Sequence, residues 1–336
     1  MTAVHKALAD EYRAALAGYM AAPDEGGRAR AYALGHRAVE AEMGLIELVD
    51  LHRAALDEIA TGAPTRAQVA ASMDFLTESL STYEMAQRGY REARERAAVA
   101  HDIALTLQRS LLPADLPEVP GVERAVRYLP AGPLVEVGGD WYDVVPLGGG
   151  RVALVVGDVM GHGVHQAAVM GQMRLGVRAY LLEGHDLHDA VGRTDALLVS
   201  LGGLQTATLV VGVVDVAAAT LCLVNAGHPP PVLVGAGGPA RLLTGAQGRL
   251  LGLEGPVVRP VLGPEPLPPG ACLLMYTDGL LEREERAGAD GIDRLVATLD
   301  GFEGSPEELC DHVVDALVDV APDDDVCLLA VRLVDC

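Results

Sequence analysis

The chain has 336 residues and half of them are hydrophobic, so it is long enough for two domains with buried cores. Its 47 acidic residues against 25 Lys and Arg give a net charge of −22, which argues against nucleic-acid binding because such proteins normally present a basic face. The five cysteines form no C-x-x-C pair, so neither a disulfide framework nor a zinc site is indicated.

The opening residues mix charged side chains with Ala and Leu and do not have the pattern of a signal peptide. The longest apolar runs, such as Val152–Val156 and Thr206–Val214, are too short to span a bilayer. We therefore expect a cytoplasmic protein with no membrane segment.

Residues 1–98 have the composition of a helical domain, rich in Ala, Leu, Glu and Arg, with predicted turns at Pro23–Gly27 and Thr61–Pro64. Apolar side chains recur at helical spacing in three stretches, which predicts an amphipathic all-α bundle. The three stretches are Ala3–Ala21, Leu45–Ile59 and a third that begins near Thr65–Gln68.

The helical pattern continues beyond this bundle, because Glu84 to Leu112 contains no proline and only one glycine. Val99, Ile103, Leu107 and Leu111 recur at four-residue steps and form a short apolar seam. The seam could pair with a second copy of the chain or pack on its own domain. Prolines at 113, 117 and 120 end the helix, so residues 99–120 are predicted to be a connector helix and linker.

Residues 121–336 have a different character, with short Val- and Leu-rich runs bounded by Gly, Pro and Asp, interrupted by pairs of helical stretches. This pattern predicts an α+β domain in which a β-sandwich is flanked by helices. The predicted strands are Val122–Leu129, Val152–Val156, Thr206–Val214, Leu221–Val224, Cys272–Tyr276 and Val326–Val334. The predicted helices are Val164–Leu182, Leu187–Leu201, Ile292–Leu299 and Pro306–Val320.

Acidic motifs follow or precede several of these strands. They are G-G-D-W-Y-D from Gly138, G-D-V-M-G-H-G from Gly157, Y-T-D-G from Tyr276 and D-D-D from Asp323. Aspartates at strand ends can project into one cleft, where they would repel one another unless cations lay between them. Carboxylate and carbonyl oxygens are the ligands that Mg²⁺ and Mn²⁺ prefer. Two such ions about 3.5–4 Å apart can activate a water and neutralise a phosphoryl group.

Taken in order with N-A-G-H-P-P-P at Asn225–Pro231, these motifs resemble those of the PPM-type protein serine/threonine phosphatases. More narrowly they resemble the bacterial RsbU/SpoIIE branch, over roughly residues 100–336. The helical domain, with Tyr12 and Tyr19 on one helix and M-D-F-L from Met73, is similar to the RsbU-type regulatory domain.

The resemblance implies a site with two Mg²⁺ or Mn²⁺ ions and a water that attacks phosphoserine or phosphothreonine directly, with no protein nucleophile. Asp158 would bridge both ions, and the carbonyl of Val159 would bind one. Asp278 and Asp324 would complete the shell of the second ion, and Asp140 matches the acid of the first family motif. Asp158 and Asp278 are therefore the predicted catalytic residues.

The resemblance gives other motif residues supporting or alternative roles. Asp325 and His162 are expected to support the site from behind the ligands. His162 and His228 could each contact substrate, act as an acid or simply form a turn, and for His228 the turn is favoured. Cys327 stands where relatives commonly have Thr, which we expect to alter packing. Lys6 is the only lysine, so the ions would hold most of the substrate phosphate, with or without an arginine.

The resemblance also implies partners. The expected substrate is a phosphoserine on a small STAS-domain anti-anti-sigma factor in a partner-switching stress pathway. The helical domain would form a homodimer and bind a switch-kinase-type activator, which would order the connector and switch on the site. No nucleic-acid or membrane partner is expected.

Three alternative interpretations of the sequence compete with this one. The G-G-D-E-F loop of diguanylate cyclases needs an acid where Trp141 stands. The pairs His101-Asp102 and His185-Asp186 lack the further histidines of an HD phosphohydrolase. A non-enzymatic signalling scaffold, in which the helical domain is the working part, stays open at the level of sequence.

Overall fold

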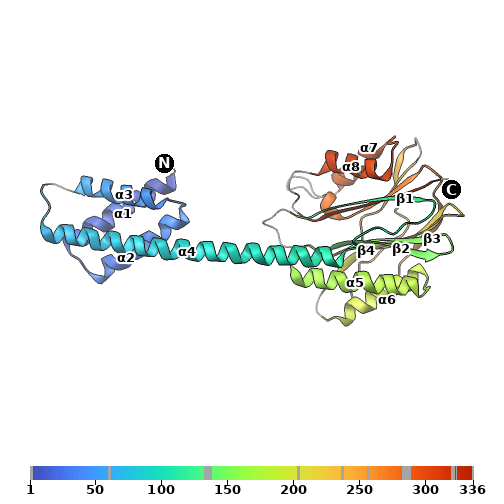
Figure 1. The fold of residues 1–336 in the computed structure, drawn as a ribbon, viewed down its shortest axis with the longest axis horizontal. Coiled ribbons are helices and arrows are strands. Elements are labelled where there is room, and N and C mark those ends of the chain that lie inside the picture. The colour runs from blue at the N-terminus through green and yellow to red at the C-terminus, as the bar shows by residue number, and fades with distance from the viewer. Residues whose placement is uncertain are drawn as a thin grey trace. The chain divides into compact units, whose positions relative to one another are not determined.

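The structure is a computed structural model, and its elements are shown in Figure 1. It describes residues 3–59, 62–131, 138–202, 205–235, 238–255, 258–281, 289–318, 322 and 324–334. Thr61 of the second predicted turn, Asp323 of the last acidic motif and the end of the helix predicted to reach Val320 lie outside these residues. Internal contacts divide the chain into two compact units, Met1–Val99 and Ala100–Cys336.

The first unit is helical, as the sequence predicts. Its elements are α1 (Ala3–Ala21), α2 (Glu25–Glu40), α3 (Leu45–Ile59) and the first part of α4 (Arg66–Leu111). Helix α2 begins inside the turn predicted at Pro23–Gly27, because the side chain of Asp24 accepts a hydrogen bond from the backbone N–H of Gly27 and caps the helix. The predicted turn is therefore wrong at its C-terminal end.

Aromatic side chains fill the centre of this helical unit. Tyr12 and Phe75 are fully buried and meet edge to face, with ring centroids 5.3 Å apart. The hydroxyl of Tyr12 lies 3.0 Å from Nδ1 of His52, whose Nε2 lies 3.0 Å from the hydroxyl of Ser72. These hydrogen bonds satisfy the buried polar atoms and link α1, α3 and α4 through one chain of contacts.

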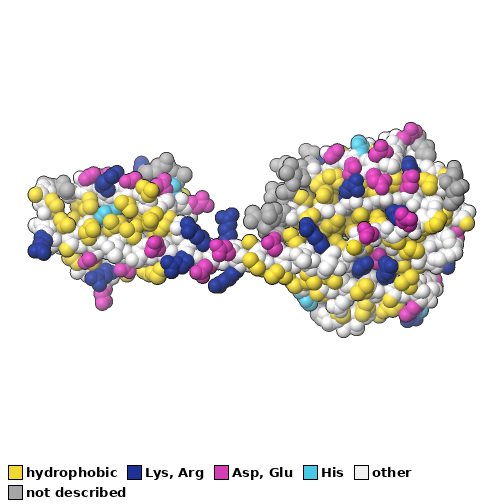
Figure 2. All heavy atoms as spheres, viewed as in Figure 1, with side chains coloured by type: hydrophobic (Ala, Val, Ile, Leu, Met, Phe, Trp, Pro, Cys, Tyr) yellow, Lys and Arg dark blue, Asp and Glu magenta, His cyan; other side chains and the backbone are white. Residues whose placement is uncertain are grey.

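Helix α4 is a single helix of 46 residues that contains both the last bundle helix and the predicted connector. Figure 2 shows Arg and Glu side chains interspersed along its middle, where Arg96 lies 3.6 Å from Glu92. The apolar seam beyond them divides into two parts. Val99 and Ile103 are 59% and 64% exposed, whereas Leu111 packs against the core of the second unit. Among the described helices, none has the length and hydropathy to span a bilayer.

Two sheets form the centre of the second unit. One is five-stranded, in the order β1 (Val122–Leu129), β11 (Val326–Leu333), β10 (Cys272–Tyr276), β6 (Val232–Val234) and β7 (Ala240–Leu242). The other contains β2 (Asp140–Gly148), β3 (Arg151–Val159), β4 (Ala207–Asp215), β5 (Thr220–Ala226) and β8 (Gln247–Gly248), with β9 (Val261–Pro266) also paired to β5.

Helices cover the outer face of each sheet (Figure 1). α5 (Val164–Leu182) and α6 (Leu187–Ser200) pack on the sheet that contains β2 to β5. α7 (Ala289–Leu299) and α8 (Pro306–Leu317) pack on the sheet that contains β1 and β11. This α/β/β/α arrangement confirms the predicted sandwich flanked by helices. Strand β2, which begins at the G-G-D-W-Y-D motif, and the short strands β6 to β9 were not predicted.

The central strands are buried on both faces because each sheet lies between the other sheet and a helix pair. In β10, Leu273 and Met275 face the core between the sheets, and Leu274 and Tyr276 face the core under α7 and α8. Such strands read as continuous apolar runs. Polar side chains from these strands can therefore gather only near the strand ends, and the acidic motifs lie at one such end.

We predict that a methyl group at Gly35 separates two helices of the first unit. A Cβ there would lie 2.2 Å from the backbone oxygen of Ser79 on α4. Gly35→Ala should lower the free energy of unfolding by about 1–3 kcal/mol. Gly18→Ala is the control, because no atom lies within 4 Å of its Cβ position. That change should raise helical stability by about 0.5–1 kcal/mol.

The measurement is urea unfolding of the full chain followed by circular dichroism at 222 nm. Trp141 is the only tryptophan and lies in the second unit, so its fluorescence reports that unit separately. If the Gly35 and Gly18 variants had equal urea midpoints by circular dichroism, α2 and α4 would be able to move apart with no loss of unfolding free energy, which would contradict the prediction.

Candidate active site

Two aspartates face each other on neighbouring antiparallel strands. Asp140, the first residue of β2, pairs directly with Asp158 of β3. Residues opposite each other in this way have Cβ atoms about 4.5–5.5 Å apart, and like charges there are destabilising. Asp140 is 3% exposed, and its buried Oδ2 has no hydrogen-bond partner among the described residues. The sequence predicted both acids, but their direct pairing comes from the register of β2.

Two further acids come from the other sheet. Asp278 follows β10 and begins the short 3₁₀ turn Asp278–Leu280. Asp324 lies just before β11, the antiparallel neighbour of β10. The ends of these strands are tied together, since the N–H of Cys327 donates to the hydroxyl of Thr277 at 2.9 Å. The sandwich thus brings acids from both sheets to the same end, as the motifs predicted.

The electrostatics show that these carboxylates crowd one another. Burial, followed by the negative charges of Asp278 and Asp324, raises the pKa of Asp158 from its usual value to about 7. Burial also raises the pKa of Asp140 well above its usual value, with the charge of Asp158 as the next cause. A cation between these groups would reverse both effects, because it stabilises the ionised form.

The chemistry of the site fits a hard divalent cation. Its ligands would all be oxygens, and the unpartnered Oδ2 of Asp140 is one of them. A Cβ on Gly139 would lie 2.2 Å from the carbonyl oxygen of Val159, so glycine keeps that oxygen uncovered. Within the described ranges, no three Asp, Glu, His or Cys side chains converge tightly enough to hold one ion alone. Backbone carbonyls and water would supply the remaining ligands, as is usual for Mg²⁺.

The carboxylate of Asp325 is occupied by hydrogen bonds. Its Oδ1 accepts from the N–H of Ala131 at 2.9 Å. Its Oδ2 accepts from the hydroxyl of Tyr128 at 2.5 Å and from Nε2 of Gln108 at 2.6 Å. Burial and the charge of Asp325 hold the pKa of Tyr128 well above its usual value, so its hydroxyl stays protonated. Sequence reasoning did not identify Gln108 or Tyr128, because neither belongs to a motif.

The two motif histidines occupy different environments. His162 is exposed in the loop between β3 and α5. His228 is 2% exposed, with Nε2 donating to the carbonyl of Tyr276 at 3.0 Å and Nδ1 accepting from the hydroxyl of Thr208 at 2.7 Å. Burial lowers the pKa of His228 to about 3, so the ring is neutral. The ring links the two sheets, because Thr208 pairs with Asp158 and Tyr276 lies two residues before Asp278. His228 is therefore not placed to act as an acid on substrate.

The second acid of the G-G-D-W-Y-D motif faces away from this cluster. Asp143 is 1% exposed and pairs with Arg178 at 2.7 Å and Arg174 at 3.3 Å, both on α5. Arg174 also donates to the carbonyl of Leu111 at the end of α4, at 2.7 Å. Asp143 therefore fixes α5 and the end of α4 to the sheet.

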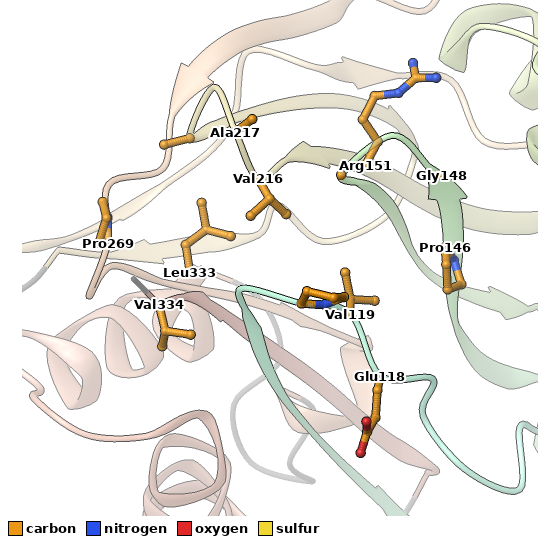
Figure 3. Close-up of a pocket in the computed structure, with 13 residues that line it drawn as sticks. Glu118, Val119, Pro146, Gly148, Arg151, Val216, Ala217, Pro269, Leu333 and Val334 are labelled. Carbon is orange, nitrogen blue, oxygen red and sulfur yellow. The ribbon is translucent and has the colours of Figure 1, made fainter. Parts of the chain in front are cut away.

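A cleft of about 720 Å³ lies at the opposite end of the sandwich, where β3 begins and β11 ends (Figure 3). Val119, Val216 and Leu333 lie around its centre, while Arg151 and Glu118 extend away from it (Figure 3). It contains none of the predicted site residues.

The side chain of Cys327 is fully buried in the core between the sheets.

Solved structures define the class of the second unit. The SiaA PP2C domain of Pseudomonas aeruginosa superimposes with a TM-score of 0.58 at 21% identity, covering 72% of this chain and 98% of that one. The RsbU and RsbW domains of a Mycobacterium tuberculosis protein match with a TM-score of 0.58 at 33% identity. This match covers 67% of this chain and 63% of that one. The fold is that of the PPM, or PP2C-like, serine/threonine phosphatases.

Family models place the chain more narrowly. Residues 148–334 match the model of stage II sporulation protein E, and residues 10–86 match the N-terminal domain of the phosphoserine phosphatase RsbU. The chain belongs to the SpoIIE family of phosphatases, which confirms the resemblance seen in its motifs. The curated protein IcfG of a Synechocystis strain is 26% identical over 241 residues. That alignment covers 63% of this chain and 37% of IcfG, so the chain spans only about a third of that relative.

We predict that the metal-free protein loses stability as the pH rises from about 4 to about 7. The pKa of Asp158 is raised from 3.8 to about 7, so the folded state retains a proton that the unfolded chain has released. A group of this kind stabilises the fold at low pH, and its contribution is lost as the pH rises through the folded-state pKa. Asp158→Asn should remove this part of the pH dependence, and saturating Mn²⁺ should flatten the wild-type curve.

The measurement is the melting temperature in buffers from pH 4 to 8, with chelator and with Mn²⁺. Asp215→Asn is a matched control, because Asp215 lies at the other end of the sandwich and accepts a hydrogen bond from Ala218 that asparagine can keep. Identical curves for wild type and Asp158→Asn would contradict the electrostatic account.

Proposed function

We propose that this protein is a metal-dependent protein serine/threonine phosphatase that uses two Mn²⁺ or Mg²⁺ ions. The observation that carries the proposal is the convergence of acids from both sheets, Asp140 and Asp158 from one and Asp278 and Asp324 from the other. Membership of the SpoIIE family supports the same reaction class.

The ions would be held by a shared set of oxygens. Asp158 would lie between them, with the Val159 carbonyl on one ion and Asp278 and Asp324 on the other. Asp140 would contribute from across the strand pair, because its Oδ2 has no hydrogen-bond partner in the described part of the chain. When bound, such ions supply an activated water and neutralise the charge of the phosphoryl group.

The chain's own residues set the conditions for this chemistry. Burial of Asp140 and Asp158 makes their ionised forms costly without cations, which favours metal binding at neutral pH. His228 stays neutral and fixes the spacing of the two sheets. Asp325 and His162 would support the site without binding an ion. Lys6 is the only lysine, so the substrate phosphate would be held mainly by the ions.

We further propose that the substrate is a phosphoserine on a STAS-domain anti-anti-sigma factor, in a partner-switching stress pathway of the cytoplasm. The match of residues 10–86 to the RsbU N-terminal domain supports this assignment. Residues 1–98 would act as the regulatory and dimerisation domain, 99–120 as the connector and 121–336 as the phosphatase domain. A switch-kinase-type protein bound to the first domain would activate the third.

Removal of a proposed ligand should abolish turnover. Asp158→Asn and Asp278→Asn should each reduce Mn²⁺-dependent release of phosphate from a phosphorylated STAS-domain protein by more than about 100-fold. A loss of activity of this size is larger than the effect usually seen when a residue that only orients a metal ligand is changed. Asp215→Asn, at the far end of β4, should keep wild-type activity.

Turnover that persists in both ligand variants would refute the site assignment. A wild-type chain that is inert toward both the phosphoprotein and a generic phosphomonoester, with Mn²⁺ and an activator of the switch-kinase class, would favour the scaffold instead.

We expect the exposed part of the α4 seam to mediate homodimerisation. Val99 and Ile103 lie one helical turn apart and are mostly exposed. Introducing charge with Val99→Glu and Ile103→Glu together should weaken self-association about tenfold or more, because a carboxylate would be buried in an apolar seam. Ala97→Glu, on a different face of the same helix, should have little effect.

Sedimentation velocity of the full chain over a concentration series measures the dimer constant. A wild-type chain that is monomeric at all concentrations, or a double variant that dimerises like wild type, would contradict this role of the seam.

A further inference from the structure

The last turn of α4 places a buried amide among the residues of the acidic cluster. Gln108 is 1% exposed, and its Nε2 lies 2.6 Å from Oδ2 of Asp325, 2.6 Å from the hydroxyl of Tyr128 and 3.3 Å from the carbonyl of Gly138. The carboxylate and the carbonyl can only accept, so the NH₂ group must face them. With two hydrogens, it makes two short bonds and one longer, shared contact.

The three partners of Gln108 come from separate segments. Tyr128 belongs to β1, Asp325 precedes β11, and Gly138 precedes β2. The hydroxyl of Tyr128 donates in turn to Asp325 and also contacts the carbonyl of Asp140 at 3.3 Å. One side chain from α4 therefore joins segments of both sheets at the acidic end of the sandwich.

Asp325 is packed between two glycines that adjoin proposed ligands. A Cβ on Gly138 would lie 2.7 Å from Oδ2 of Asp325, and one on Gly279 would lie 2.2 Å from its backbone oxygen. Gly138 is two residues before Asp140, and Gly279 directly follows Asp278. Because Asp325 is in close contact with both glycines, a shift of Asp325 must also move the backbone that carries Asp140 and Asp278.

The backbone of Asp325 also orients a third proposed ligand. Its N–H donates to Oδ1 of Asp324 at 2.7 Å, which fixes the direction of that carboxylate. Among the described residues, Gln108 and Tyr128 are the two side chains that donate hydrogen bonds to the carboxylate of Asp325 and so hold it in position. Groups behind metal ligands that orient them in this way typically change metal affinity when altered.

We propose that Gln108 is a positioning residue for metal binding, which acts through Asp325 to fix the ligands Asp140, Asp278 and Asp324. The proposal rests on the phosphatase function proposed above. It assigns the last turn of α4 to the architecture of the active site. Gln108 itself touches neither ion nor substrate in this assignment.

The test uses Gln108→Met in the full chain. Methionine matches glutamine in length and helix propensity but has no N–H to donate. Mn²⁺ affinity, measured by isothermal titration calorimetry and by the Mn²⁺-induced rise in melting temperature, should fall about 10–100-fold. Turnover at saturating Mn²⁺ should recover most of the wild-type rate, because the ligands themselves are intact.

Gln87→Met is the matched control. It makes the same substitution in the same helix, where Nε2 of Gln87 donates to the hydroxyl of Tyr83 within the first unit at 3.2 Å. Its Mn²⁺ affinity should equal that of wild type. Tyr128→Phe removes the other side-chain donor to Asp325 and should weaken Mn²⁺ binding in the same direction.

The outcomes separate the inference from the proposed function. If wild type binds Mn²⁺ and Gln108→Met binds it equally well, the positioning role is overturned while the phosphatase function stands. If Gln108→Met does not fold, Tyr128→Phe decides, and unchanged Mn²⁺ affinity there overturns the role. If wild type itself neither binds Mn²⁺ nor releases phosphate, the proposed function fails and this inference fails with it.

Discussion

Repulsion among buried carboxylates is the constraint on which the rest of this structure depends. Asp140 and Asp158 face each other across a strand pair, and the charges of Asp278 and Asp324 act on Asp158 from the other sheet. Burial, and after it these charges, raises the pKa of Asp158, so bringing such groups together without cations has a cost. The surrounding structure keeps them together, and in the proposed function this cost would favour the binding of divalent ions.

Several independent contacts hold the two sheets in place against that repulsion. His228 links Thr208 and Tyr276 directly behind the acids, as a neutral ring with both nitrogens in use. Asp325 fills the space between Gly138 and Gly279 and is held by Gln108 and Tyr128. Away from the cluster, the contacts of Asp143 with α5 fix the helix that follows the Asp158 loop. Rigidity of this kind is what a preorganised ion site needs.

Helix α4 belongs to both halves of the chain. Its first part packs in the aromatic core around Tyr12 and Phe75, and its last turn carries Gln108 into the acidic site. Leu111, three residues later, accepts a hydrogen bond from Arg174 of α5. A change in the position of this last turn would therefore act on the ligands and on α5 together.

The sequence by itself determined the order of elements, the class of each domain and the identity of the acids. Buried strands such as β10 are continuous apolar runs, helices such as α5 have clear periodicity, and aspartates next to glycines at strand ends predict a cation site. Strand β2 was missed because its start, G-G-D-W-Y-D, reads as a loop motif. Strands β6 to β8 have only two or three residues each, and the sequence V-L-G-P-E-P of β9 contains a glycine and two prolines that are typical of a turn.

Only the tertiary structure decided which groups meet. The pairing of Asp140 with Asp158 follows from strand register, which the sequence of β2 alone does not specify. The roles of His228 and Asp325 depend on partners 48 and 217 residues away in the chain, Tyr276 and Gln108. Local patterns carry no information about such contacts, because the hydrogen-bond partners of a buried polar group are set by how the sheets and helices pack.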